Sequence, residues 1–206
     1  MKYLIGRTIL ETDGTVVVIG LSGSLRRDSY NSALLAAAAE LAPAHLRLKI
    51  WPGLHSIPPY DEDLQALGDP ESVSTLRAGM QQAQAALIAP PEYNWGMPGQ
   101  LKNALDWLSR PLTANPLRFK PVAIIGASGG PMGAIRSQIQ LRQVLTAMDA
   151  RVISKPEVLV THAAQRFDAD GRLVDDIARR LLAQLLLELG EQAGHQRARA
   201  DLTRAS

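Results

Sequence analysis

The sequence predicts a doubly wound α/β fold, in which a five-stranded parallel sheet carries helices on both faces. Short apolar runs alternate along the chain with longer segments of helical periodicity. Most of the short runs are continuously apolar, as is typical of parallel strands that are covered on both faces. The chain has 206 residues, of which 46% are apolar and 20% charged, and this is enough for one domain with a full core but too little for two.

The apolar runs and the helical segments define the expected elements in order. Strands are predicted at 16–21, 46–51, 85–89, 121–126 and 157–161, and helices at 31–42, 70–83, 99–109, 134–148 and 174–190. The second helix begins with Asp69 as an N-cap followed by Pro70, and Gly190 ends the last helix. We therefore expect a domain over 16–190, an N-terminal extension of unknown role over 1–15, and a polar, flexible C-terminal tail over 191–206.

Composition excludes several classes of function. The net charge is only +2, so no surface for nucleic acid is expected. The chain has no cysteine, which removes disulfides, thiolate metal sites and cysteine nucleophiles, and its four histidines lack metal-ligand spacing. No apolar run is long enough to span a membrane, and the first fifteen residues do not read as a signal peptide. We expect a cytoplasmic protein without a bound metal.

Three loops that follow strands are rich in glycine and polar residues. They are 22-SGSLRRDSYN-31, 90-PPEYNWGMPGQLKN-103 and 126-GASGGPMGAIR-136. In an open parallel sheet, ligands bind beyond the carboxyl ends of the strands, at the point where the strand order reverses. If the strand order is 2-1-3-4-5, an order that periodicity alone does not supply, these three loops converge on one site.

The first loop has the composition of an anion site. Ser24, Ser29 and Asn31 can donate hydrogen bonds, Arg26 can add a full charge, and the following helix N-terminus favours an anion. The loop lacks both the G-x-x-x-x-G-K-[ST] and the G-x-G-x-x-G patterns, which argues against a P-loop or a Rossmann dinucleotide site. A capped turn without a ligand explains the same residues equally well.

The second loop suits a flat ligand. Tyr93, Asn94 and Trp95 offer aromatic surface and amide hydrogen bonds, and the glycines around them allow close backbone approach. The alternative is that Tyr93 and Trp95 are partly buried anchors of a proline-rich loop. The longest irregular stretch, 52–69, and the helix 99–109 are candidates for a subunit interface, or else for a surface lid and a core helix.

The third loop formally contains G-x-S-x-G, the nucleophile motif of serine esterases. Ser128 would be the nucleophile, with Asp149 and His162 downstream in the order of a catalytic triad. Pro131 directly after the motif does not suit the immediate helix start that a nucleophile elbow requires, so the esterase is the weaker interpretation.

Taken together, the three loop segments closely resemble the signature segments of the NADPH-dependent FMN reductase family, a flavodoxin-like family that includes quinone, chromate and azo-dye reductases. The likeness runs from about residue 16 to about residue 189. It implies a three-layer sandwich with sheet order 2-1-3-4-5, a bound FMN, and NADPH or NADH as hydride donor. One departure is Gly96, where the family often has serine.

The resemblance also implies site residues and partners. FMN would carry the chemistry, so no catalytic side chain is expected, and hydride would pass by a ping-pong mechanism to a small acceptor such as a quinone, free flavin, chromate or an azo compound. Relatives are homodimers or homotetramers. An FMN-binding electron carrier without NADPH turnover is the alternative from another class.

The implied FMN contacts are Ser24, Arg26, Ser29 and Asn31 at the phosphate, Pro91, Glu92, Tyr93, Asn94 and Trp95 along the ring and ribityl chain, and Ser128, Gly129 and Gly130 on the other side of the flavin.

Overall fold

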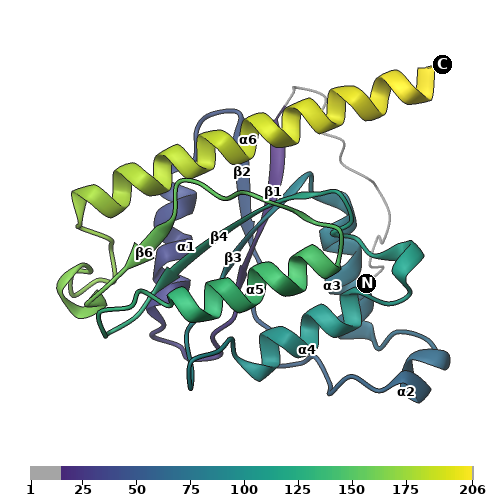
Figure 1. Ribbon diagram of the computed structural model, residues 1–206, viewed down its shortest axis with the longest axis horizontal. Helices are drawn as coiled ribbons and strands as arrows, with labels where there is room; N and C mark the ends of the chain where they lie inside the picture. The colour runs from purple at the N-terminus through teal and green to yellow at the C-terminus, as the bar shows by residue number, and fades with distance from the viewer. Residues whose placement is uncertain (1–14, 206) are drawn as a thin grey trace, which may run out of the picture.

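A parallel sheet forms the centre of the computed structural model, which describes residues 15–205 and, for side chains, residues 15–196. Its strands run in the order β2-β1-β3-β4-β5, with β6 also paired to β4, and every pairing is parallel. This confirms the predicted order (Figure 1). The predicted extension lies outside the described residues except for Thr15. The strands are β1 Val16–Ser22, β2 Leu46–Ile50, β3 Ala85–Ala89, β4 Pro121–Ala127, β5 Arg151–Val152 and β6 Val158–Val160.

Two short strands, β5 and β6, take the place of the predicted fifth strand beside β4. β5 pairs with the first two residues of β4, and β6, at the predicted position of the fifth strand, pairs with its last three. Pro156 lies between them and has no N–H to offer to a ladder, which interrupts the pairing there. The sequence pattern missed β5 because two residues carry no periodicity.

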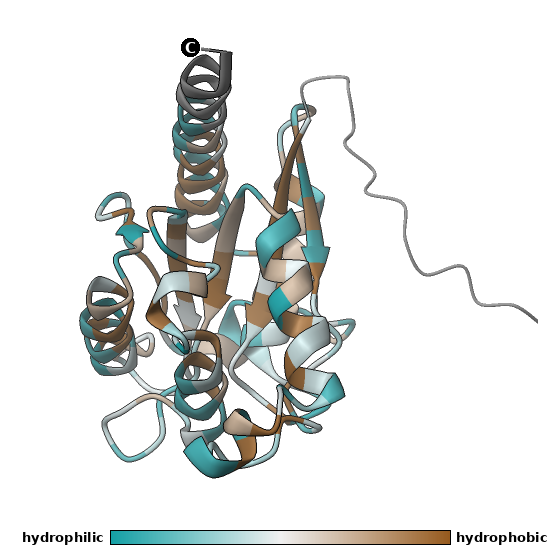
Figure 2. Ribbon diagram, turned by 90° about the vertical axis from the view of Figure 1, so that its right-hand side faces the viewer, coloured by the Kyte–Doolittle hydropathy of each residue, from teal (hydrophilic) through white to brown (hydrophobic). Residues whose placement is uncertain are grey.

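Helices cover both faces of the sheet. One face packs against α1 and α6, and the other against α3, α4 and α5 (Figure 1). Apolar strands lie between the helical layers in Figure 2, and each face has its own cluster of buried side chains. The helices are α1 Tyr30–Leu41, α2 Glu62–Ala66, α3 Glu71–Gln82, α4 Gly99–Leu108, α5 Ile135–Ala147 and α6 Asp176–Ala205, with 3₁₀ turns at Leu112–Ala114 and Ala163–Gln165.

Two predicted helix boundaries are wrong. The last helix does not end at Gly190 but continues to Ala205, so the backbone of the predicted flexible tail is helical over most of its length. Gly190 instead allows close packing, because a Cβ there would lie 2.8 Å from His45 Nε2. At the start of α3 the N-cap is Pro70, and the Asp69 carboxylate pairs with Arg77 Nε at 2.6 Å.

The irregular stretch after β2 is fastened to α4. Gln100 donates to the carbonyls of Leu54 and Ile57, while Asn103 and Trp107 both donate to the carbonyl of Pro58. These three side chains are spaced three and four residues apart, so they share one side of the helix. The stretch also contains the short helix α2, which the sequence pattern did not reveal. The buried residues Leu101, Leu105 and Leu108 show that the other side of α4 is core.

Two cations, one buried and one half-buried, satisfy helix ends at the edge where the strands begin. Lys120 Nζ donates to the carbonyls of Met80 and Ala83, at the end of α3. Arg77 donates to the carbonyls of Trp107 and Leu108, at the end of α4. Burial disfavours the charged ammonium and lowers the pKa of Lys120 from 10.5 to about 8.

Candidate functional site

The loop after β1 is organised by its own serines. Ser22 Oγ accepts from the N–H of Ser24, and Ser24 Oγ accepts from the N–H of Arg26, each at 3.3 Å. Ser29 is the N-cap of α1, and its hydroxyl accepts from the N–H of Asn31 at 3.2 Å. Both Ser24 and Ser29 are buried, which fixes the turn that leads into the helix.

The predicted anion donors sit where this turn meets the helix. In the part of the chain that the structure describes, the backbone N–H groups of Tyr30 and Ser32 have no protein acceptor. The Arg26 side chain is exposed, and among residues 15–196 its hydrogen bond is to the carbonyl of Asp28, at 2.6 Å. Free N–H groups at the start of a twelve-residue helix, with an exposed guanidinium in the loop before them, are a favourable environment for an anion.

Asn31 holds the first loop to the third through its side-chain amide. Its side-chain amide donates to the carbonyl of Ala127 and accepts from the N–H of Ala127, both at 3.0 Å, and the residue is buried. This clamp ties the start of α1 to the end of β4, so it fixes the first loop relative to the third. The Asn31 side chain therefore positions the first loop, and its contact with a phosphate stays a prediction.

The second loop lies directly against the first. Gly23 donates its N–H to the carbonyl of Ala89 at 3.0 Å, and a Cβ on Gly23 would come within 3.1 Å of Pro91. Pro90 and Pro91 are themselves buried. Glycine at this position is required by close approach, and the result is that the exits of β1 and β3 share one edge.

The second loop presents its aromatic residues on a tight turn. Tyr93 and Gly96 exchange both backbone hydrogen bonds at 3.0 Å, and the two residues between them, Asn94 and Trp95, have φ of 49° and 66°. Positive φ at both central residues is the requirement of a type I′ turn, and it is costly for a bulky side chain. Tyr93 is 49% and Trp95 76% exposed, so the alternative of partly buried anchors is wrong.

Glu92 joins this turn to α5. Its carboxylate accepts from Arg136 Nη1 at 2.7 Å and from the backbone N–H of Arg136 at 2.9 Å. The second bond satisfies a donor in the first turn of α5, where a negative charge is favoured. Both oxygens of the Glu92 carboxylate are thus bonded to Arg136, so the predicted contact of Glu92 with the ligand would be made by its backbone.

Gln140 occupies the space beside Gly96. Its Oε1 accepts from the N–H of Met97 at 2.6 Å, and a Cβ on Gly96 would lie 2.9 Å from the same oxygen. A serine at this position, as relatives often have, would have to displace the Gln140 side chain. Glycine in place of the family's serine therefore goes together with Gln140, one turn into α5, which fills the space that the serine side chain would need.

The third loop exposes bare backbone. Gly129 and Gly130 are exposed, and a Cβ built on either meets no atom within 4 Å. The loop is held from behind, because Ser128 donates its N–H to the carbonyl of Val160 and His162 donates to that of Gly130, both at 3.0 Å. Neither glycine has positive φ, so what distinguishes them is open space next to the chain rather than conformation.

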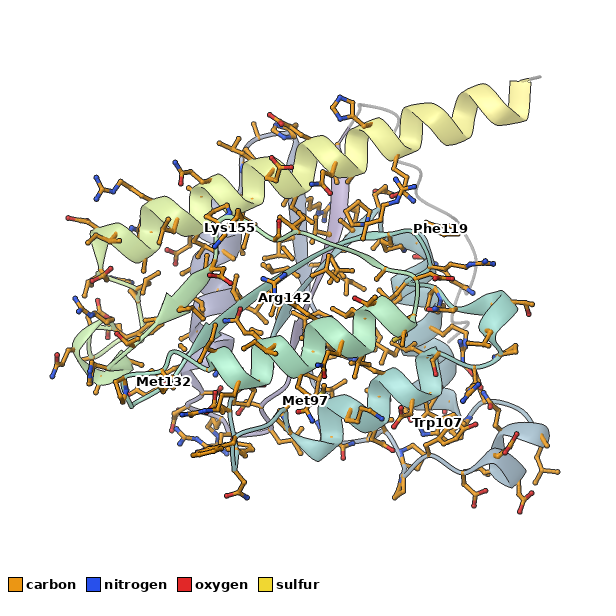
Figure 3. All side chains as sticks on the ribbon, viewed as in Figure 1. Met97, Trp107, Phe119, Met132, Arg142 and Lys155 are labelled. Atoms are coloured by element: carbon orange, nitrogen blue, oxygen red, sulfur yellow. The ribbon has the colours of Figure 1, made fainter. Side chains whose placement is uncertain are left out.

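The catalytic triad of an esterase is not assembled. Ser128 Oγ donates to the carbonyl of Gly130 at 3.2 Å. Asp149 pairs with Arg118 at 3.3 Å and lies just before β5, at the opposite edge of the sheet. His162 follows β6 and bonds neither of the two in the described residues. The separation of the two edges is visible in Figure 3, where Met97 and Met132 lie far from Phe119.

The geometry therefore brings together the three predicted loops at one edge. Within residues 15–196, no three metal-ligating side chains gather at a point, and none of the described helices is long and apolar enough to cross a membrane. The backbone of Gly129 and Gly130 borders open space, which leaves room for a flat ligand. The free N–H groups at the start of α1 suit an anionic group on the same ligand.

Comparison with known proteins decides the family. The sequence profile of the NADPH-dependent FMN reductase family matches residues 16–165. The chain belongs to this family. It is an oxidoreductase with FMN as cofactor and NAD(P)H as donor. The match begins at β1 and ends after β6, at the 3₁₀ turn Ala163–Gln165, so it contains all three loops.

Individual relatives agree with the family. The chain is 47% identical over 174 residues to a protein of Pseudomonas aeruginosa named NAD(P)H-dependent FMN reductase, with 84% of this chain and 93% of that one covered. It is 43% identical over 143 residues to a quinone reductase of Escherichia coli, covering 69% and 76%.

Solved structures confirm the flavodoxin-like sandwich. The flavoenzyme NAD(P)H:acceptor oxidoreductase FerB of Paracoccus denitrificans superimposes with a TM-score of 0.78 at 34% identity, over 87% of this chain and 97% of that one. A flavodoxin variant from Pseudomonas aeruginosa, at 16% identity and a TM-score of 0.52 over 86% of this chain and 99% of that one, shares the fold alone.

Arg136 and Gln140 are the site residues that sequence reasoning missed. Both lie on α5, and each contacts the second loop. Their only signal was proximity to the third loop, since long polar side chains on a helix usually point to solvent. The contact across the site depends on the adjacency of β3 and β4, which periodicity does not reveal.

Proposed function

We propose that this chain is an FMN-dependent NAD(P)H oxidoreductase that reduces small acceptors, such as quinones, free flavin, chromate or azo compounds, in a ping-pong cycle. The observation that carries the proposal is the convergence of three loops that are bonded to one another. Asn31 joins the first loop to the third, Gly23 joins the first to the second, and Glu92 joins the second to α5.

The phosphate of FMN would lie at the loop after β1. The N–H groups at the start of α1 and the hydroxyls of Ser24 and Ser29 are the nearest donors to such an anion, and Arg26 can swing onto it because only one carbonyl now holds it. Hydrogen bonds between a cation and a phosphate are among the stronger ones in proteins. Asn31 would act indirectly, by holding this helix start in place.

The ring would lie between the second and third loops. Pro91, Glu92, Asn94 and the neighbouring backbone would line one side, and Ser128, Gly129 and Gly130 the other. Backbone N–H groups near Asn94 and Gly129 can donate to the edge of the ring, where negative charge develops on reduction. FMN, when bound, supplies the chemistry, which is the acceptance of a hydride and its delivery to the acceptor.

The protein's own contribution is to bind, orient and limit access. We expect no side chain in the three loops to be an indispensable acid or base, and Ser128 is bonded to its own loop. An exposed site open to solvent suits a scheme in which NADP⁺ leaves before the acceptor enters.

We further expect a homodimer or homotetramer, with the stretch 52–69 as a candidate interface, and the cytoplasmic location stays a prediction.

The proposal is tested by steady-state kinetics on the FMN-reconstituted protein. Initial rates of NADPH oxidation at several fixed concentrations of 1,4-benzoquinone should give parallel double-reciprocal lines, as a ping-pong cycle requires. Converging lines would contradict the proposed order of steps. A protein that binds FMN without oxidising NADPH would instead be an electron carrier, the alternative that the flavodoxin fold leaves open.

A further inference from the structure

Trp95 has an unusual combination of exposure and restraint. Its side chain is 76% exposed, and among the large apolar side chains of residues 15–196 only Leu67 is more so. An exposed tryptophan is ordinarily free to change rotamer. Here the backbone is held in the left-handed region by the two hydrogen bonds of the Tyr93–Gly96 turn. Because that conformation costs free energy in a bulky residue, the surrounding structure has to enforce it.

The indole is also fixed from one side by a cation. The guanidinium carbon of Arg136 lies 4.5 Å from the centre of the Trp95 ring, within the range of a cation–π contact. That guanidinium is itself held by Glu92, whose side chain is only 11% exposed, through the 2.7 Å ion pair. A planar guanidinium anchored to a nearly buried carboxylate is a rigid support, and it covers one face of the indole.

Trp95 is 76% exposed, and among the described residues no aromatic ring and no cation other than Arg136 lies over its indole. A flat aromatic surface, fixed in orientation and open on one side, is a platform on which a second flat ring can stack. It stands on the loop that lines the proposed flavin site, one residue from Asn94.

We propose that Trp95 is a specificity-determining residue that stacks on the flat ring of the electron acceptor, and that Arg136 and Glu92 are positioning residues for its indole. The inference rests on the proposed function and names its acceptor class, which is fused-ring aromatic quinones rather than compact or inorganic oxidants. Acceptors with a larger planar area gain more from the platform, so they are favoured over small ones.

The first test compares two acceptors in Trp95→Ala. Relative to the wild-type protein, the ratio of kcat/KM for 1,4-naphthoquinone to kcat/KM for hexacyanoferrate(III) should fall about tenfold, because only the naphthoquinone offers a planar face. Trp95→Tyr should restore most of the ratio. Leu67→Ala, which removes an even more exposed apolar side chain outside the site, should leave the ratio as it is. An unchanged ratio in Trp95→Ala would overturn the proposal.

The second test needs no turnover. Calorimetric titration of the FMN-loaded protein with 2-naphthol, a fused ring that is not reduced, should give a dissociation constant about tenfold higher in Trp95→Ala than in the wild-type protein. The double variant Glu92→Gln with Arg136→Gln leaves no unpaired charge and should raise the same constant about threefold. An unaffected constant in the double variant would remove the positioning part of the proposal.

Two further readouts separate competing roles of Trp95. If Trp95→Ala no longer retains FMN, the indole is a cofactor contact and the proposal fails while the proposed function stands. If the variant changes its sedimentation coefficient, the free face is a subunit contact and the proposal fails in the same way. A wild-type protein that binds FMN but oxidises no NADPH would defeat the proposed function itself, and that result is distinguishable because it appears before any substitution is made.

Discussion

The two edges of the sheet use similar polar residues in opposite ways. At the edge where the strands begin, Lys120 is buried and Arg77 half-buried, and their donors are taken up by helix carbonyls and the Asp69 carboxylate, so little is left over for a ligand. At the edge where the strands end, Arg26 is exposed with a single bond, and Gly129 and Gly130 face open space. The contrast teaches that cations alone do not mark the site, whereas unsatisfied donors beside bare backbone do.

The strongest way to break this contrast is to fill the open space at the carboxyl edge. Gly129→Val should raise the dissociation constant for FMN by about two orders of magnitude, because a branched side chain would stand where the ring approaches the backbone. The measurement is a titration of apoprotein followed by flavin fluorescence. Gly194→Val is the matched control, since Gly194 also faces open space but lies on α6. Equal affinities in the two variants would place the ligand elsewhere.

The opposite edge should respond to pH instead of to FMN. The pKa of Lys120 is about 8 in the folded protein and 10.5 in the unfolded chain, so between these values the unfolded state binds more protons and stability rises with pH. The free energy of unfolding of the wild-type protein, relative to Lys120→Met, should increase by about 2 kcal/mol from pH 7.5 to pH 10.

Urea unfolding at the two pH values measures this change. The constant cost of leaving the carbonyls of Met80 and Ala83 without a donor in Lys120→Met cancels in the comparison. If the difference in free energy of unfolding between the two proteins does not vary with pH, Lys120 keeps an ordinary pKa. The claim that the two edges differ in the burial of their cations would then be contradicted.

The Asn31 clamp between the first and third loops should affect both FMN binding and stability. Asn31→Ala should lower the free energy of unfolding by about 1 to 2 kcal/mol, because both polar groups of Ala127 lose a buried partner. It should also weaken FMN binding, although the side chain is not proposed to contact the phosphate. Thermal unfolding with and without FMN separates the two effects. Loss of affinity without loss of stability would return Asn31 to the role of a direct ligand.

The smallest effect is expected at the stretch after β2, which is fastened to α4 and belongs to none of the three loops. Trp107→Phe keeps the buried ring but removes the Nε1 donor to the carbonyl of Pro58, which should cost about 1 kcal/mol of stability. FMN affinity should not change, because the stretch after β2 does not belong to the three loops. Urea denaturation and FMN titration on the same sample test both statements, and weakened FMN binding would extend the site toward that stretch.

Much of the fold followed from the sequence because buried parallel strands are continuously apolar. That pattern located β1, β3 and β4 and hence the three loops. Short elements such as β5 and α2 escaped because they have too few residues for a period. Gly190 was misread as a helix end, since a glycine that serves close packing looks the same in sequence as one that ends a helix.

The site was predictable in its residue types but not in their partners. Ser24, Ser29 and the third-loop glycines lie at the predicted edge. The side chains of Asn31 and Glu92, by contrast, turn out to hold the loops together. A partner such as Ala127 or Arg136, far away in sequence, can be assigned to them only when strand adjacency is known. Polar residues that bind and polar residues that position are therefore alike in sequence and differ in structure.

The central claim is that the first loop holds the phosphate of FMN, and neighbouring arginines test it most directly. Arg26 and Arg27 are both exposed and adjacent, so Arg26→Ala and Arg27→Ala change the net charge equally. Titrating each apoprotein with FMN should give a dissociation constant raised by about 30-fold for Arg26→Ala, as expected for a lost charged hydrogen bond, and by less than about threefold for Arg27→Ala. Equal dissociation constants for the two variants would contradict the placement of the phosphate at this loop.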